Sequence, residues 1–231
     1  MESYLNEPFL TKRQKYARWG SFIGLGALVL GLMTSTRSPL LSYGFLVVGL
    51  LAASFGSYTA NRYVREPRAD QVLNRVLDGL DKRYALYHYY FATPHVLASH
   101  LGLTVFLPKI QEGEITYEDG RWRHRAGFRK FLQLFGEPGL SKPHVELEED
   151  IKWLKEWIDA AMPGDDIPVT GAVVFTNPKA TVHASKAPVP ALTPDQLVVF
   201  LKQGLKGQVS TLSTAKQKEL RRVLDEAIAA D

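Results

Sequence analysis

Two long, uncharged, apolar stretches near the N-terminus constrain this chain more than any other feature of its sequence. The first runs from residue 19 to residue 36 and the second from residue 40 to residue 61, and the turn between them carries one charged residue, Arg37. About 20 apolar residues are enough for a helix to cross the hydrocarbon core of a bilayer, which is about 30 Å thick. The sequence therefore predicts two transmembrane helices, at residues 19–36 and 39–61, which form an antiparallel hairpin.

The distribution of basic residues predicts the orientation of this hairpin. Basic residues precede the first helix and follow the second, and they are Lys12, Arg13, Lys15, Arg18, Arg62, Arg65 and Arg68. Because cytoplasmic flanks of membrane helices carry an excess of Lys and Arg, we expect a multi-pass protein of the cell membrane with both termini and the soluble domain in the cytoplasm. Two other interpretations stay open: a cleaved signal peptide, for which no A-x-A cleavage site follows, and a buried soluble hairpin, which leaves both uncharged runs without a polar face.

The remainder of the chain has the composition of a folded domain. Over all 231 residues, 45% are hydrophobic and 11% aromatic, and 28 basic residues nearly balance 24 acidic ones, so intrinsic disorder is excluded. The chain has no cysteine, which excludes a disulfide scaffold, a zinc ribbon and a cysteine nucleophile.

Apolar periodicity after residue 69 predicts an α+β domain. Helical spacing marks residues 70–82 and 143–162, strand-like stretches lie at 84–91, 96–98, 103–107 and 181–184, and the apolar run at 169–175 fits a strand buried on both faces. Asp119-Gly120 predicts a two-residue hairpin, and Thr193 and Thr214 each open a capping-box pattern. The expected organisation is a basic N-terminus (1–18), the hairpin (19–61), a linker (62–69), the domain (70–192) and a C-terminal helical pair (193–231).

Several segments of the domain match, in order, those of a known family. The order is a helix, strands, a strand ending in Lys, a hairpin with a Trp, a Pro-led helix and a buried apolar strand. The matching segments are Pro94–Leu97, Leu101–Lys109, Gly113–Ile115, Gly120–Trp122, Pro143 with Glu146, and Gly171–Phe175. In this order and spacing, residues 70–192 resemble the nuclease-related domain, NERD, of the restriction-endonuclease-like superfamily. The resemblance implies an α+β fold with a mixed sheet and flanking helices, preceded here by the transmembrane hairpin.

The resemblance also implies a catalytic pattern that this chain does not keep. Nucleases of the superfamily hold a divalent metal between an Asp and a Glu at adjacent strand ends, with a Lys two residues after the Glu. The matched positions here are Pro94, Leu107 and Lys109, and neither Pro nor Leu can supply an oxygen ligand to Mg²⁺. We therefore expect no cofactor. The alternative is an active nuclease that binds Mg²⁺ through relocated carboxylates, for which the candidates are Glu112, Glu114, Asp70 and Asp78.

His95 and Lys109 are the candidate catalytic residues that the resemblance leaves. A histidine at this place could act as a general base or contact a phosphate. A strand histidine with no carboxylate partner in the sequence is more often a hydrogen-bonded core residue, and this is the role we expect.

A basic cluster follows the predicted hairpin turn, and it consists of Arg121, Arg123, Arg125, Arg129 and Lys130. Alternate residues of a strand share a face, so the first three form a row that could bind nucleic acid or anionic lipid headgroups; a solvated hairpin is the simpler alternative. The acidic stretch at residues 137–166 also permits self-association against this row. Together these patterns predict a membrane-anchored, nuclease-related domain without catalytic carboxylates, which acts as a binding or scaffolding module and not as an enzyme.

Overall fold

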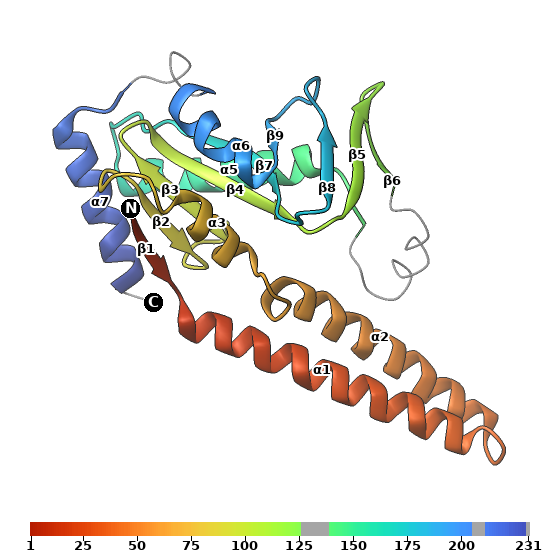
Figure 1. Ribbon diagram of the computed structural model, residues 1–231. Helices are drawn as coiled ribbons and strands as arrows, with labels where there is room; N and C mark the ends of the chain where they lie inside the picture. The colour runs from red at the N-terminus through yellow and green to blue at the C-terminus, as the bar shows by residue number, and fades with distance from the viewer. Residues whose placement is uncertain (126–138, 205–210, 230–231) are drawn as a thin grey trace. The chain divides into compact units, whose positions relative to one another are not determined.

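The computed structural model describes residues 1–125, 139–204 and 211–229 (Figure 1). The described chain divides into two compact units. A helical unit covers residues 7–68, and a second unit, the α+β domain, combines residues 1–6 with the described residues after 68. The segment that precedes the helical unit and the segment that follows it thus belong to the same domain.

The helical unit is a hairpin of two long helices, α1 (Glu7–Thr34) and α2 (Pro39–Tyr63). Both helices are long and apolar enough to cross a membrane, and just 22% and 17% of their most apolar windows are buried inside the protein. A core helix of a soluble protein would be mostly buried. Helix α1 begins at Glu7, twelve residues before the apolar stretch at residue 19, so the basic residues of the N-terminal flank lie on its first turns.

Small residues let the two helices approach closely. A Cβ atom added to Gly24 would lie 2.5 Å from the amide nitrogen of Ala53, and one added to Gly56 would lie 2.5 Å from the amide nitrogen of Ser21. The large apolar side chains point outward instead; Phe22, for example, is 70% exposed. The hairpin therefore packs through its small residues and presents its apolar side chains to its surroundings, as membrane helices do.

The α+β domain is built on a six-stranded mixed sheet in the order β1-β2-β3-β4-β7-β9. Its strands are β1 (Glu2–Leu5), β2 (Ala85–His88), β3 (His95–Ser99), β4 (Gly102–Lys109), β7 (Val169–Phe175) and β9 (Ala191–Leu192). Strands β2, β3 and β4 form an antiparallel meander, and β7 pairs parallel with β4. As expected for a strand buried on both faces, the last five residues of β7 are all buried.

Three further strands form a separate sheet in the order β6-β5-β8. They are β5 (Gly113–Glu118), β6 (Arg121–Arg125) and β8 (Ala180–His183). The two-residue turn between β5 and β6 lies at the predicted Asp119-Gly120, where both residues have positive φ angles of 52° and 72°, as a type I′ turn requires. The predicted hairpin at Asp119-Gly120 therefore belongs to a different sheet from the strands that periodicity predicts before it.

Helices cover both faces of the six-stranded sheet, so the domain has three layers (Figure 1). One core contains Leu147 and Leu154 of α5 (Pro143–Ala161) together with Leu220 of α7 (Thr214–Ala229). The other contains Leu73 of α3 (Ala69–Leu77) and Leu197 of α6 (Pro194–Val199), which continues into a π-helical turn, η2 (Phe200–Gly204). The two cores, the α5 core and the α3 core, lie on opposite faces of the sheet because alternate strand residues point to opposite sides.

The two predicted capping boxes have different outcomes. At α6 the side chain of Gln196 accepts the backbone N–H of Thr193 at 3.0 Å, as predicted. At α7 the capping residue is Ser213, one position before the predicted Thr214, because the Ser213 hydroxyl accepts the backbone N–H of Lys216 at 3.3 Å. The prediction of Thr214 as the cap was therefore wrong by one residue.

Strand β1 joins the sheet through a parallel pairing with β2 that the sequence analysis did not anticipate. Arg221 of α7 bonds the Glu2 carboxylate and lies over the rings of Tyr4 and Tyr87, 5.5 and 5.7 Å from their centroids. Tyr87 donates its hydroxyl to Asp225 at 3.0 Å, and burial raises the pKa of this tyrosine far above its ordinary value. The first residues of the chain are therefore an integral part of the domain.

Candidate functional site

Lys109 lies at the end of β4 on the face of the sheet that α5 covers. Its ammonium contacts the Glu146 carboxylate of α5 at 2.7 Å, and the two side chains are 11% and 40% exposed. Glu146 lies in the first turn of α5, which starts at Pro143; a proline there presets the helical φ angle, and a carboxylate there favours the helix dipole. We call these two residues the Lys109 pair.

Pro94 and Leu107 are the other two positions matched to the superfamily's pattern. Val96 of β3 is aligned with Val105 of β4, where the pairing of the two strands ends; Pro94 directly precedes β3, and Leu107 lies two residues beyond Val105 on β4. Both residues are buried. Leu107 shares the α5 face with Lys109, since Val105 and Leu107 belong to the α5 core and alternate strand residues share a face. Two of the three positions matched to the superfamily's Asp, Glu and Lys therefore lie on one face of β4, and the third lies at the start of the neighbouring strand.

The hairpin of the small sheet brings an aromatic wall toward α5. Trp122 donates its indole N–H to Nδ1 of His144 at 3.0 Å, and its ring lies 5.2 Å from that of Tyr117 and 6.4 Å from that of Phe175. His144 follows Pro143 in the first turn of α5, two residues before Glu146. Trp122 and His144 therefore join the hairpin of the small sheet to the first turn of α5, which also carries Glu146.

His95 lies on the opposite face of the sheet from Lys109, next to the α3 core. Its Nδ1 contacts Nδ1 of His88 at 2.8 Å, and Nε2 of His88 contacts Oδ1 of Asn74 at 3.2 Å. Asn74 Oδ1 also accepts the Ser3 hydroxyl at 2.7 Å. Because an amide oxygen can only accept, His88 carries its proton on Nε2 and His95 donates from Nδ1.

This hydrogen-bonded chain joins β1, α3, β2 and β3. The two imidazoles are 0% and 1% exposed, so His95 has the environment of a hydrogen-bonded core residue. The structure does not bring the two candidate catalytic residues, His95 and Lys109, together.

The four carboxylates considered as relocated metal ligands are spread over the domain. Asp70 is buried on α3, on the far side of the sheet from Lys109, and accepts the Tyr89 hydroxyl at 3.3 Å. Glu114 of β5 lies 3.5 Å from Arg125, Glu112 precedes β5, and Asp78 is an exposed residue after α3. Within the described ranges, no group of three or more His, Asp and Glu side chains is arranged to hold a metal ion.

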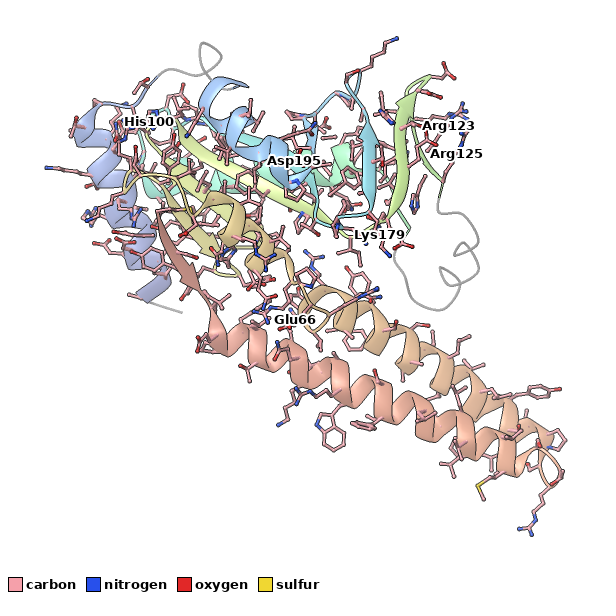
Figure 2. All side chains as sticks on the ribbon, in the orientation of Figure 1. Glu66, His100, Arg123, Arg125, Lys179 and Asp195 are labelled. Carbon is pink, nitrogen blue, oxygen red and sulfur yellow. The ribbon has the colours of Figure 1, made fainter. Side chains whose placement is uncertain are left out.

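The row of three arginines on β6 lies on one exposed face, as predicted, but acidic residues lie beside it. All three of its residues, Arg121, Arg123 and Arg125, are exposed on β6, and Figure 2 shows Arg123 and Arg125 together at this strand. Their cross-strand partners on β5 are Glu118, Thr116 and Glu114. Arg123 also lies 3.3 Å from Asp119. Arg129 and Lys130 lie outside the described residues.

Sequence reasoning missed Glu146 as the partner of Lys109. The signal was present, because the resemblance aligned Pro143 and Glu146 with the start of a family helix, but pattern alone did not show that this helix packs on the Lys109 face. Comparison with known proteins adds no further assignment: no family model matches the chain, and neither a curated protein nor a solved structure matches it.

Proposed function

We propose that this chain is a membrane-anchored domain of the nuclease-related type which has lost its hydrolytic metal centre and acts as a binding or scaffolding module. The observation that carries the proposal is that Leu107 and Lys109 share one face of β4, while Pro94 directly precedes β3, the strand beside it. The resemblance assigns a metal-binding Asp to position 94 and a metal-binding Glu to position 107. Here they are a proline and a leucine, both buried.

The order of elements supports the relationship on which the proposal depends. A helix (α3), a meander ending in Lys109, a hairpin that carries Trp122, a proline-led helix (α5) and a buried strand (β7) follow one another in the order expected of a NERD domain. Strands β3 and β4, which would supply the Asp and the Glu, are adjacent and antiparallel.

The chemistry of the site argues against metal-assisted hydrolysis. Mg²⁺ requires oxygen ligands, usually carboxylates with several waters, at about 2.1 Å. Pro94 and Leu107 supply none, and the carboxylate that does lie beside Lys109 is neutralised by it at 2.7 Å. An ion that used Glu146 would have to displace the lysine.

Membrane anchoring completes the proposal. Residues 1–6 belong to the same domain as the described residues 69–125 and 140–204, so a hairpin that spans a bilayer must have both ends on the same side. The basic residues that flank these ends, such as Arg18 and Arg62, assign that side to the cytoplasm. The turn near Arg37 then lies outside.

Cysteine labelling tests the topology, because the chain has no native cysteine. Thr36 in the turn and Lys186 in the domain are both exposed. In intact cells, a cysteine at Thr36 should react with an impermeant thiol reagent, while one at Lys186 should react after the cells are permeabilised. Labelling at Lys186 in intact cells would refute the cytoplasmic assignment.

Binding of Mn²⁺, followed by electron paramagnetic resonance on the full chain in detergent, tests the loss of the metal centre. We expect no saturable site. The alternative function, an active nuclease with relocated ligands, predicts a saturable site that a change at Glu112, Glu114, Asp70 or Asp78 weakens, and that result would replace the proposal. Pro94→Asp with Leu107→Glu gives a matched variant in which a restored site would bind the ion.

A further inference from the structure

A cavity separate from the Lys109 pair opens in the domain. It has a volume of about 450 Å³ and lies where the segment after α3, the turn between β3 and β4, and η2 meet. Its apolar lining includes Leu80, Tyr84 and Leu201, which are 5%, 6% and 3% exposed. All three belong to the α3 core, so this cavity lies on the opposite side of the sheet from Lys109.

Two cations, Arg83 and Lys202, and one carboxylate, Asp81, line the same cavity. The Asp81 carboxylate accepts the backbone N–H of Arg83 at 2.9 Å and binds its guanidinium through Nε at 3.0 Å and Nη2 at 2.6 Å. This pairing lowers the pKa of Asp81 to about 2, so the carboxylate stays ionised; the side chains of Arg83 and Asp81 are 62% and 48% exposed. A guanidinium has five N–H donors, and Arg83 keeps several of them for a ligand.

His100 contributes a polar atom that faces no partner. Its Nδ1 is buried and has no hydrogen bond within the described part of the chain, while its ring meets that of Tyr84 edge to face at 5.6 Å. Burial, assisted by the charge of Arg83, lowers the pKa of this histidine. A neutral imidazole can either donate or accept, and a buried polar atom without a hydrogen bond is unfavourable unless a ligand or water supplies one.

We infer that this cavity binds a small organic anion, an aromatic or aliphatic body that carries one phosphate or carboxylate group. The body packs on Leu80, Tyr84 and Leu201, and the acidic group binds the N–H donors of Arg83 and Lys202. His100 Nδ1 forms a hydrogen bond with the entering molecule. Two cations against one carboxylate leave one positive charge, which favours an anion over a cation or a neutral molecule. The inference names a ligand class for the proposed binding role and rests on that role.

Histidine NMR on the full chain in detergent micelles tests this inference with phenyl phosphate as the probe. The chain has six histidines, and His100→Gln identifies the signal of His100. Phenyl phosphate should shift the His100 ring signal in a saturable way and leave the signals of His88 and His95, which lie elsewhere in the core, unchanged. Phenol or inorganic phosphate alone should bind more weakly, because phenol lacks the acidic group and inorganic phosphate lacks the apolar body.

Charge removal identifies the anion contacts. Arg83→Gln and Lys202→Gln should each weaken phenyl phosphate binding by about tenfold, which is about 1.4 kcal/mol. Arg123→Gln, which removes an exposed arginine on β6 (Figure 2), is the matched control and should have no effect. The inference is overturned if no saturable shift of His100 occurs, if all histidines shift together, or if the control weakens binding as much as Arg83→Gln.

The outcome of this test is distinguishable from failure of the proposed function. Absence of phenyl phosphate binding would remove the cavity as a ligand site but leave the metal-free Lys109 face as it is. A saturable Mn²⁺ site would refute the proposed function whether or not the cavity binds the probe.

Discussion

Removing Glu146 should destabilise the domain more than removing the charge of Lys109. The lysine side chain is 11% exposed and the glutamate 40%. Glu146→Gln leaves a buried ammonium without a counter-charge, whereas Lys109→Met keeps the packing of the lysine stem and leaves a carboxylate that water can reach. The asymmetry follows because an uncompensated buried charge costs more than a hydrated one.

The size of these effects can be estimated from the geometry. A hydrogen bond between charged groups contributes about 1.5 to 3 kcal/mol, and exposure of Glu146 reduces this figure, as it does for surface pairs. We expect Glu146→Gln to cost about 2 kcal/mol and Lys109→Met about 1 kcal/mol or less. The double variant Lys109→Met with Glu146→Gln should cost less than the sum of the two single changes, with a coupling of about 1 kcal/mol.

Pulse proteolysis in urea, applied to the full chain in detergent, measures the free energy of unfolding of the domain for each variant. Lys152→Met with Glu156→Gln is a matched control, because that pair is 3.9 Å apart on α5 and its side chains are 77% and 67% exposed. Its coupling should be close to zero. A larger cost for Lys109→Met than for Glu146→Gln, or additive costs, would refute the argument that the lysine is the buried partner.

Four further changes have defined expectations. Gly102→Ala should lower the free energy of unfolding by about 2 kcal/mol or more, because Gly102 has a φ of 107° and an added Cβ would lie 2.3 Å from the Pro168 carbonyl oxygen. Gly120→Asn, at a φ of 72° with open space around it, should lower it by less than about 1 kcal/mol in the same urea assay. The raised pKa of Tyr87 keeps its hydroxyl protonated in the folded state above pH 10, where the unfolded tyrosine ionises. Its contribution to stability is therefore present below pH 10 and is lost above it at about 1.4 kcal/mol per pH unit. Tyr87→Phe should flatten this part of the profile of unfolding free energy against pH, and an unchanged slope would contradict the assignment. The last change replaces the exposed row of Arg121, Arg123 and Arg125 with Gln. If these arginines bound phosphates, the change would reduce the salt dependence of single-strand binding by about 0.7 per lost contact. Because Glu114, Glu118 and Asp119 lie beside them, we expect no change in nucleic-acid binding and no change in adsorption to anionic vesicles.

Local patterns predicted the elements of the domain well because each depends on neighbouring residues. The apolar run at 169–175 is strand β7, the Pro-led periodicity at 143–162 is α5, and the Asp119-Gly120 turn closes the β5–β6 hairpin. The two apolar helices followed from hydropathy in the same way.

Features that depend on contacts between distant segments were not predictable from these patterns. Strand β1 has four residues, and its pairing with β2 spans more than 80 positions of sequence. The division of the strands into two sheets likewise depends on the parallel pairing of β5 with β8. Periodicity identifies which face of a strand is apolar, but not which strand lies beside it.

The candidate site shows the same division. The positions of Pro94, Leu107 and Lys109 came from motif order; Leu107 and Lys109 share one face of β4, and Pro94 precedes the strand beside it. The separation of His95 from Lys109 was not predicted. It follows from the tertiary structure, in which Leu97 of β3 belongs to the α3 core and Leu107 of β4 to the α5 core, because alternate strand residues share a face. Glu146 and the cavity beside His100 required the tertiary structure.

A cleavage assay tests the central claim most directly. The full chain, purified in detergent, is incubated with single- and double-stranded DNA and with RNA in the presence of Mg²⁺ or Mn²⁺, alongside Lys109→Ala. Because Pro94 and Leu107 offer no ligand to the metal, we predict that the chain cuts none of these substrates above the level of the Lys109→Ala variant. Metal-dependent cleavage that Lys109→Ala abolishes would contradict the account.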